Sequence, residues 1–485
     1  MPNKSAIPKS YNAEFLLAIF GGIFYFYKVK LNNSLSLLSL DPLVCLSIML
    51  ILILLTSIGV YLYKTRFKVH ALFGSQKPIT KSNKLIQRES LLSLTNRHTL
   101  ILGTPGTGKT FGVLYPQIYE DIKANKFIVI IDPKGDHSFR DAVYSMAKLF
   151  NRSDSFHYIS LNHPKMSTPY TFLNFGTPTE LRDKLIAATT WDNSYYKKLA
   201  ETKLLSILEE NPKTLIEIVK KIPDTESFAG LRADIFNLHQ SPLHDSFIDI
   251  DAQTLLNFYH QRSILFISLD VLSFPLTSRS LGRIILNDIK TLVNHIQSQI
   301  VENDRIATTL IIDEFVSFAT LEFIDLLNKA RSARIQVLMA TQSVSDFDVN
   351  DKNLLPQIID STTNKIILRL SDPKSIEYCS KLTGTTNDTK ITNQIKTNMF
   401  FNTSTGVGSE REVERFIIAP KDIRQLGTLE GFLYTQDPFY VSKVYFNRFK
   451  NFPLTITPYT HKTSFSASLT NDIQLIKGEL PPCSL

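Results

Sequence analysis

The chain of 485 residues has only three cysteines, Cys45, Cys379 and Cys483, and they lie far apart in the sequence. Their positions match neither the paired spacing of a structural zinc site nor the C-x-x-C spacing of a redox centre. The fold therefore does not depend on a cysteine-bound metal or on a disulfide framework. This usage is typical of a protein whose folded part lies in a reducing compartment, the cytoplasm.

The sequence has little excess charge outside one segment. The formal net charge is +8, but between Lys64 and His98 eight lysine and arginine residues stand against Glu89 alone. This segment carries nearly all of the excess, and it directly follows a hydrophobic run. Binding to a membrane surface explains it at least as well as binding to nucleic acid does. The net charge therefore identifies no nucleic-acid-binding protein.

Internal repeats and heptads are absent, and no small-residue cleavage site follows the first apolar stretch, which argues against a signal peptide. The segment Pro42–Tyr63 has 22 residues without a charge. As a helix it would extend about 33 Å, enough to cross a hydrocarbon core of about 30 Å. An earlier segment, Tyr11–Leu31, can span if Glu14 and Lys28 reach the interface. We expect a two-helix anchor in residues 1–66, with most of the chain on the cytoplasmic side.

A glycine-rich segment, "GTPGTGKT", fits the pattern G-x-x-x-x-G-K-[ST] at every fixed position. Glycines allow successive backbone N–H groups to turn inward around a phosphate chain. The lysine then reaches the outer phosphates and the last hydroxyl can bind Mg²⁺. A short apolar run precedes the segment and a helical pattern follows it, as in a phosphate-binding loop. The predicted nucleotide-binding residues are Gly103, Thr104, Pro105, Gly106, Thr107, Gly108, Lys109 and Thr110.

Two further apolar runs end in polar residues that suit hydrolysis. Asp313 and Glu314 follow "TTLII", and Gln342 follows "IQVLMAT". Asp313 can hold Mg²⁺ together with Thr110, whereas Glu314 can polarise the attacking water. Gln342 can sense the terminal phosphate or orient that water. The adjacent carboxylates favour hydrolysis over nucleotide binding alone.

Other polar residues near these runs leave alternatives open. Arg331 and Arg334 are each either a solvated helix charge or an arginine that completes the site of a neighbouring subunit, and Arg331 is our choice for that role. Asp132 and Lys134, in "IIDPKGD", follow another strand-like run. They either approach the nucleotide or simply form a turn.

Strand-like and helical runs alternate in two blocks, which predicts an α/β fold with a doubly wound, mostly parallel sheet. Between the blocks helical periodicity dominates, which indicates an all-α inserted domain. The Thr- and Asn-rich segment 385–410 is expected to be a loop or a long hairpin. The expected parts are an anchor (1–66), the first part of the nucleotide-binding domain (67–165), the all-α insertion (166–261), the second part of that domain (262–457) and a polar tail (458–485).

With these motifs in place, the sequence resembles the TraG/TraD-type coupling-protein ATPases of conjugative type IV secretion systems. The resemblance covers most of the chain from about Arg97 to Asp437, together with the expected two-span anchor. It rests on "IIDPKGD", "SLDVLSFPLTSRSLGRIILNDI", "IIDEFVSFATLEFIDLLNKARSARIQVLMATQS", "DPKSIEYCSKLTGT" and "GVGSEREVERFIIAPKDIRQL" in this order. Generic ATPases share the phosphate loop but not this series.

The resemblance implies a RecA-like P-loop motor core that uses ATP and Mg²⁺ and assembles as a homohexamer on the inner membrane. It implies binding of single-stranded DNA with a relaxase, as a relaxosome, and delivery to type IV secretion channel components. By position it assigns phosphate and Mg²⁺ binding to Lys109 and Thr110, Mg²⁺ binding to Asp313 and water activation to Glu314. It likewise assigns phosphate sensing to Gln342 and a trans-acting role to Arg331.

Several features depart from this pattern or support other classes. The loop between the two predicted spans is short, and a long acidic C-terminal tail is missing. A DNA translocase not tied to secretion stays possible, although no basic C-terminal module is present to read DNA polarity. A coupling ATPase for protein effectors is a further alternative. A non-hydrolysing scaffold would not need Glu314, and an ABC-type ATPase would need an LSGGQ-like segment, which is absent.

Overall fold

The computed structural model describes residues 76–78, 97–189, 191, 193–248, 252–320, 322–349, 354–398, 401–446 and 456–460. The chain divides into two compact units, Met1–Lys68 and Val69–Leu485, and the described residues all belong to the second. Both predicted membrane spans lie outside the described residues. Within the described part, no helix combines the length and the apolar character that crossing a membrane requires.

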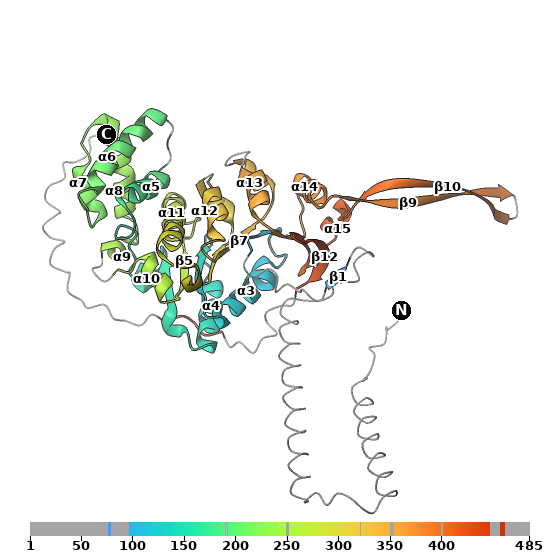
Figure 1. Cartoon of the computed structure of the whole chain (residues 1–485), viewed down its shortest axis with the longest axis horizontal. Coiled ribbons are helices and arrows are strands. Elements are labelled where there is room, and N and C mark those ends of the chain that lie inside the picture. The colour runs from blue at the N-terminus through green and yellow to red at the C-terminus, as the bar shows by residue number, and fades with distance from the viewer. Residues whose placement is uncertain are drawn as a thin grey trace, which may run out of the picture. The chain divides into compact units, whose positions relative to one another are not determined.

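A ten-stranded sheet forms the centre of the second unit, in the order β1-β12-β11-β8-β2-β7-β6-β3-β5-β4 (Figure 1). The strands from β8 to β4 run parallel, whereas β11, β12 and β1 extend one edge in antiparallel fashion. The strands are β1 (Gln76–Pro78), β2 (Thr99–Leu102), β3 (Phe127–Asp132), β4 (Phe156–Ser160), β5 (Ile264–Ser268), β6 (Thr308–Ile312), β7 (Ile335–Thr341), β8 (Asn364–Leu368), β11 (Glu430–Gln436) and β12 (Phe439–Tyr445).

The predicted mostly parallel α/β sheet is confirmed, and its antiparallel pairs lie at the edge formed by β11, β12 and β1. Only Asp437 and Pro438 separate β11 from β12. Two residues can join antiparallel neighbours, whereas a parallel pair needs a crossover of a dozen residues or more. The chain therefore turns back on itself at this edge.

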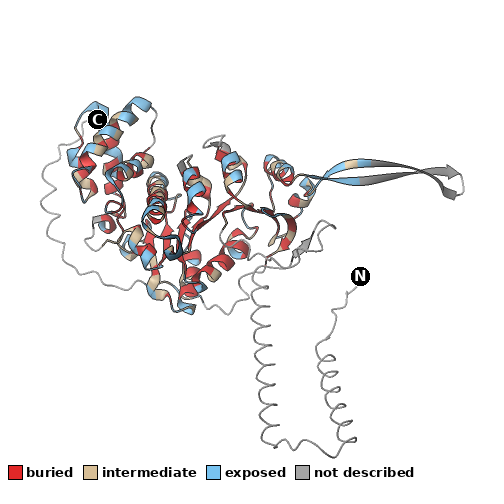
Figure 2. Cartoon of the chain, viewed as in Figure 1, coloured by how far each residue is buried: buried red, intermediate tan, exposed pale blue. Residues whose placement is uncertain are grey.

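Helices cover both faces of the sheet. Because successive strand residues face opposite sides, Leu100 and Leu102 of β2 belong to one buried cluster and Ile101 to another. The helices α3 (Tyr115–Lys123) and α4 (His137–Leu149) contribute to the cluster of Ile101. The opposite cluster includes α11 (Pro275–Gln299), α12 (Glu322–Ala330), α13 (Leu354–Ser361), α14 (Pro373–Thr383) and α15 (Pro420–Arg424). Figure 2 shows the buried sheet between helices whose outer surfaces are exposed.

A block of helices lies between β4 and β5, within the segment 166–261. Its members are α5 (Pro178–Ala188), α6 (Ser194–Leu208), α7 (Leu215–Lys221), α8 (Ala229–His239), α9 (His244–Ile248) and α10 (Leu255–His260). The Thr177 hydroxyl and the Glu180 carboxylate form a capping box at the start of α5. Such reciprocal bonds satisfy two backbone donors that the first helical turn leaves free.

A fully buried ion pair joins this block to α11. Lys184 Nζ of α5 lies 2.5 Å from Asp288 Oδ1, and both side chains are fully enclosed. The ammonium group also donates to the carbonyl oxygens of Phe172 and Phe175, and the Tyr170 hydroxyl donates to Asp288 Oδ2 at 2.7 Å. Every charge in this network therefore has polar partners, as burial requires.

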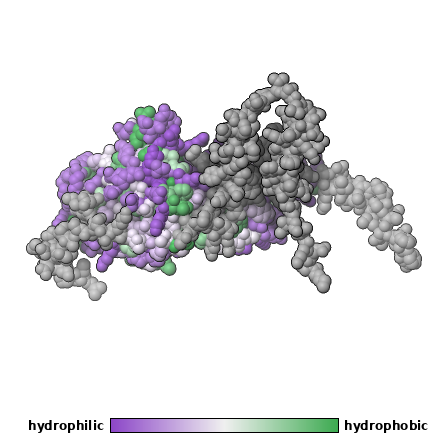
Figure 3. Space-filling view, turned by 90° about the horizontal axis from the view of Figure 1, so that it is seen from below, coloured by the Kyte–Doolittle hydropathy of each residue, from purple (hydrophilic) through white to green (hydrophobic). Residues whose placement is uncertain are grey.

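Strands β9 (Thr385–Asn398) and β10 (Phe401–Phe416) pair with each other as a two-stranded antiparallel sheet. Of the two forms that the sequence left open here, the structure has the long hairpin, which extends away from the main sheet in Figure 1. Its pairing register shifts between Ser404 and Gly408. On the face seen in Figure 3, the described surface is mostly hydrophilic with small separate hydrophobic areas.

Tyr459 adds to the core from beyond the end of the sheet. Its ring lies 5.2 Å from those of Tyr144 and Phe156, and the Arg140 guanidinium lies 5.7 Å from its centre. The Tyr459 N–H donates to Asp141 Oδ1. The predicted polar tail (458–485) thus contributes at least one residue to the packed part of the chain, because the Tyr459 ring packs against other aromatic rings.

Replacement of Asp288 tests the buried network. Asp288→Ala leaves the Lys184 charge enclosed without its counter-ion, so we expect the free energy of unfolding to fall by about 3–5 kcal/mol. Chemical denaturation of the purified protein measures this change. The double variant Lys184→Met/Asp288→Leu removes both charges and should lose less stability than the single variant. A larger loss in the double variant would contradict this account.

Candidate active site

The parallel strands bring four chain segments to one edge of the sheet. Leu102 of β2 pairs with Thr341 of β7, and Ile312 of β6 pairs with Met339 of β7 and Ile131 of β3. The residues that follow these strands therefore lie along the same carboxyl edge, where parallel α/β sheets bind ligands. The predicted phosphate loop, the Asp313–Glu314 pair, Gln342 and the turn after β3 all belong to this edge.

The phosphate loop is tied to its neighbouring strands through the backbone. The Gly103 N–H donates to the Thr341 carbonyl at 3.2 Å, and the Thr104 N–H donates to the Arg369 carbonyl at 3.1 Å. The loop ends in a short π-helix, Lys109–Leu114, for which Gly108 is the N-cap. Gly106 and Gly108 have φ angles of 76° and 106°, a region that favours glycine.

Lys109 points back into its own loop. Its ammonium group donates to the Gly103 carbonyl and lies 3.9 Å from Glu314 Oε1. Burial lowers the pKa of Lys109 below its ordinary value, although the Glu314 and Asp313 carboxylates act in the opposite direction. The cation is thus held inside the cradle that would receive the phosphates.

Asp313 and Glu314 directly follow β6. The Asp313 side chain is 2% exposed and that of Glu314 is 15% exposed. Glu314 has φ 45° and ψ 51°, a left-handed conformation that is uncommon for a residue other than glycine and is concentrated at functional sites. Gln342 Nε2 donates to Glu314 Oε1 at 3.1 Å. The structure therefore brings Glu314, Gln342 and Lys109 together.

Lys134 joins this cluster from the turn after β3. Its Nζ atom lies 3.0 Å from Asp313 Oδ2 and 3.3 Å from Glu314 Oε1. Burial acts to lower the pKa of Lys134, but the two carboxylates outweigh it and the pKa is raised. Asp132 fixes the turn by accepting the N–H groups of Lys134 and Asp136, each at 3.1 Å. Burial raises the pKa of Asp132 to about 6, against these hydrogen bonds.

A cavity of about 430 Å³ opens beside the phosphate loop. Its lining residues are Thr104, Pro105, Gly106, Gly108, Lys109, Thr110, Phe111, Lys134, Glu314, Gln342, Thr428 and Leu429. The backbone cradle and two lysines suit a phosphate chain, whereas Phe111 and Leu429 supply an apolar wall. The size falls within the usual range of small-molecule sites.

The residues present also fit Mg²⁺. Thr110 and Asp313 offer hydroxyl and carboxylate oxygens, the hard ligands that this ion takes, and the buried Asp313 carboxylate already binds a cationic group. Among the described residues, no group of three or more His, Cys, Asp and Glu side chains could hold a metal ion by itself. A Mg²⁺ ion here would therefore be bound by these residues together with phosphate oxygens of the nucleotide, as is usual for this ion.

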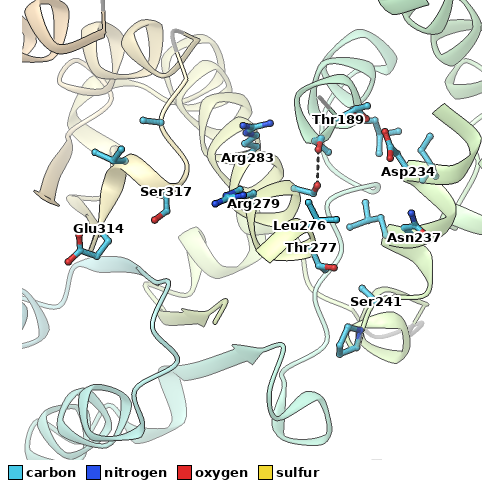
Figure 4. Close-up of a pocket in the computed structure, with 18 of the residues that line it drawn as sticks. Thr189, Asp234, Asn237, Ser241, Leu276, Thr277, Arg279, Arg283, Glu314 and Ser317 are labelled. Atoms are coloured by element: carbon cyan, nitrogen blue, oxygen red, sulfur yellow. Dashed lines mark hydrogen bonds between the residues drawn. The ribbon is translucent and has the colours of Figure 1, made fainter. Parts of the chain in front are cut away.

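A larger cavity of about 1110 Å³ lies between the helical block and the sheet edge. Figure 4 shows Glu314 on the side of the sheet, Asp234 and Asn237 on the side of the helical block, and Arg279 and Arg283 on α11. Glu314 and Gln342 line both cavities. We assign the nucleotide to the smaller one, because only that cavity contains the phosphate loop.

Arg331 and Arg334 do not line the nucleotide cavity of their own chain. Both are exposed and precede the amino end of β7, whereas Gln342 follows its carboxyl end. The Arg334 guanidinium donates to the Arg305 carbonyl at 3.2 Å. The assignment of Arg331 to the site of a neighbouring subunit stays a prediction.

Sequence reasoning missed several residues of the site. The Arg369 carbonyl accepts both the N–H and the hydroxyl of Thr104, and the Leu429 N–H donates to the Thr107 carbonyl. Leu429 has φ 64°, but no motif surrounds it in the sequence. A carbonyl group is present in every residue, so the local sequence held no signal for Arg369.

The two positive-φ glycines of the loop differ in their surroundings. A Cβ atom at Gly108 would lie 2.6 Å from Leu429 Cδ2, whereas one at Gly106 would meet no atom within 4 Å. We expect Gly108→Ala to lower the free energy of unfolding by about 2–4 kcal/mol and Gly106→Ala by about 1 kcal/mol. Thermal unfolding without added nucleotide measures both. Equal losses would contradict the close approach of Leu429 to Gly108.

Comparison with known protein families gives two matches. Residues 307–428 match the family described as the TraM recognition site of TraD and TraG. Residues 90–274 match the family described as the central domain of the helicase HerA. Direct comparison with curated protein sequences gives no match.

Solved structures of the conjugative coupling protein TrwB share the fold. The unbound form of the bacterial protein TrwBΔN70 is 20% identical, with a TM-score of 0.54 over 75% of this chain and 88% of that one. TrwB with the non-hydrolysable ATP analogue ADPNP is 18% identical, with a TM-score of 0.54 over 77% of this chain and 88% of that one. TrwB with ADP and Mg²⁺ is 17% identical, with a TM-score of 0.51 and the same coverage.

Taken together, the sheet, the phosphate loop and these matches establish a P-loop NTPase fold. The segment with the Asp313–Glu314 pair and Gln342 lies within the match to TraD and TraG. The chain is thus similar to the TraG/TraD-type coupling proteins, which confirms the resemblance inferred from its motifs.

Proposed function

We propose that this chain is a membrane-anchored ATPase that recruits DNA or a relaxase–DNA complex and delivers it to a type IV secretion or conjugation channel. The observation that carries the proposal is the convergence of Lys109, Glu314 and Gln342 on the cavity of the phosphate loop. The match to the TraM recognition site of TraD and TraG supports a role at the relaxosome.

The proposed reaction is hydrolysis of ATP to ADP and inorganic phosphate. The loop N–H groups and Lys109 bind and orient the phosphates. Glu314 accepts a proton from the attacking water as the new phosphorus–oxygen bond forms and the bond to ADP breaks. Gln342 holds Glu314 through its amide and senses the terminal phosphate. Asp313 and Thr110 would hold Mg²⁺, whose charge balances that of the phosphate oxygens.

The remaining parts of the proposal follow the resemblance. Residues 1–66 anchor the chain in the inner membrane, and the rest of it lies in the cytoplasm. Six copies form a ring in which Arg331 of one subunit acts at the nucleotide of its neighbour. The transported substrate is single-stranded DNA with its relaxase, handed to channel components of the secretion system.

The first test is ATP hydrolysis by the purified full-length protein, with and without single-stranded DNA. We expect DNA to raise the rate several-fold, and Glu314→Gln to abolish hydrolysis while nucleotide binding persists, because the amide cannot accept the proton. Glu302→Gln, at an exposed glutamate away from the cavity, is the matched control and should hydrolyse normally. An ATPase rate that is the same with and without DNA would instead favour a protein substrate. Nucleotide binding without hydrolysis would favour a scaffold.

Subunit mixing tests the role of Arg331. If Arg331 acts across the subunit boundary, Arg331→Ala and Glu314→Gln proteins are each inactive, but rings assembled from both contain some sites with an intact Glu314 and an intact neighbouring Arg331. We expect mixed assemblies to recover a measurable fraction of the wild-type ATPase rate, and Arg334→Ala to stay active. Full activity of Arg331→Ala alone would remove this residue from the mechanism.

A further inference from the structure

Lys134 lies between the two carboxylates that the proposed function assigns to Mg²⁺ binding and hydrolysis. Its ammonium group is within 3.3 Å of an oxygen atom of both Asp313 and Glu314. It also lines the cavity of the phosphate loop. Because Glu314 and Gln342 are the residues proposed to act at the terminal phosphate, Lys134 lies at that end of the site.

The Oε1 atom of Glu314 has several donors around it. Gln342 Nε2 is 3.1 Å away, Lys134 Nζ is 3.3 Å away and Lys109 Nζ is 3.9 Å away. A carboxylate oxygen has two lone pairs, and Gln342 and Lys134 both lie within hydrogen-bonding distance of this one. Release of Lys134 would therefore return one acceptor position on this oxygen to a water molecule.

The Lys134 side chain has room to move, whereas its backbone is fixed. The side chain is 48% exposed, and four flexible methylene groups carry its charge. The backbone is held by the Asp132 carboxylate, and the neighbouring Pro133 carbonyl accepts the Val271 N–H at 2.8 Å. The ammonium group can thus exchange partners by rotation of the side-chain bonds alone, while the backbone of the turn stays in place.

We propose that Lys134 is the residue by which this site distinguishes a nucleoside triphosphate from a diphosphate. Its ammonium group exchanges the Asp313–Glu314 pair for the terminal phosphate, and this exchange frees Glu314 to hold the attacking water. Lys109 differs because it is buried and donates to the Gly103 carbonyl of its own loop. The inference rests on the proposed nucleotide function and adds to it a residue that determines nucleotide specificity.

Nucleotide binding to the full-length protein tests this role without hydrolysis. The probes are a fluorescent non-hydrolysable ATP analogue and fluorescent ADP, both with Mg²⁺. In Lys134→Ala we expect the Kd of the triphosphate to rise about tenfold, the usual effect of losing one charged hydrogen bond, and that of the diphosphate to stay within about twofold. Lys134→Arg keeps the charge and should retain most of the discrimination.

Two further variants keep the test decisive. Lys134→Gln keeps a polar side chain that is one atom shorter and carries no charge, and it should lose the discrimination as Lys134→Ala does, even if the alanine variant folds poorly. Lys123→Ala removes a half-exposed lysine that pairs with Glu120 at 3.7 Å and should change neither Kd. Equal weakening of both nucleotides, or no change in the triphosphate, overturns the inference. If the wild type binds neither nucleotide, the proposed function fails instead.

Discussion

The parallel pairing of β2, β7, β6 and β3 is the constraint on which the site depends. The residues of its motifs come from positions 103 to 342, yet they lie along one edge because the strands end in register. A one-residue slip in any strand would turn its side chains to the opposite face of the sheet. Backbone hydrogen bonds between strands thus set the distances between the charged groups.

The parallel sheet and the phosphate loop were predictable from the sequence because both depend on local patterns. Long apolar runs make β3, β6 and β7 recognisable, and a fixed spacing defines the loop. The order of strands across the sheet depends on pairing between distant segments, so it could not be predicted in this way. The contact of Lys134 with Asp313, and that of Leu429 with Thr107, have the same origin. The position of Lys134 after a strand-like run made it a candidate in the sequence. Its contacts with Asp313 and Glu314 depend on the pairing of distant strands, so they could not be predicted.

Two lysine–carboxylate clusters in this chain have different roles because their surroundings differ. Lys184 is enclosed by Asp288 and two backbone carbonyl groups, so moving it would leave a charge without partners. Lys134 binds two carboxylates at the rim of a cavity, and half of its side chain is accessible. The first cluster fixes the helical block to α11. The second leaves a cation where anionic ligands can compete for it.

The wall that Glu314 and Gln342 share between the two cavities has a thermodynamic consequence. A ligand in the larger cavity that changes the free energy of nucleotide binding must have its own binding free energy changed by the same amount. Such linkage needs no chain of intervening residues, because Glu314 and Gln342 line both cavities. The occupancy of each compartment then depends on the chemical potential of the ligand in the other.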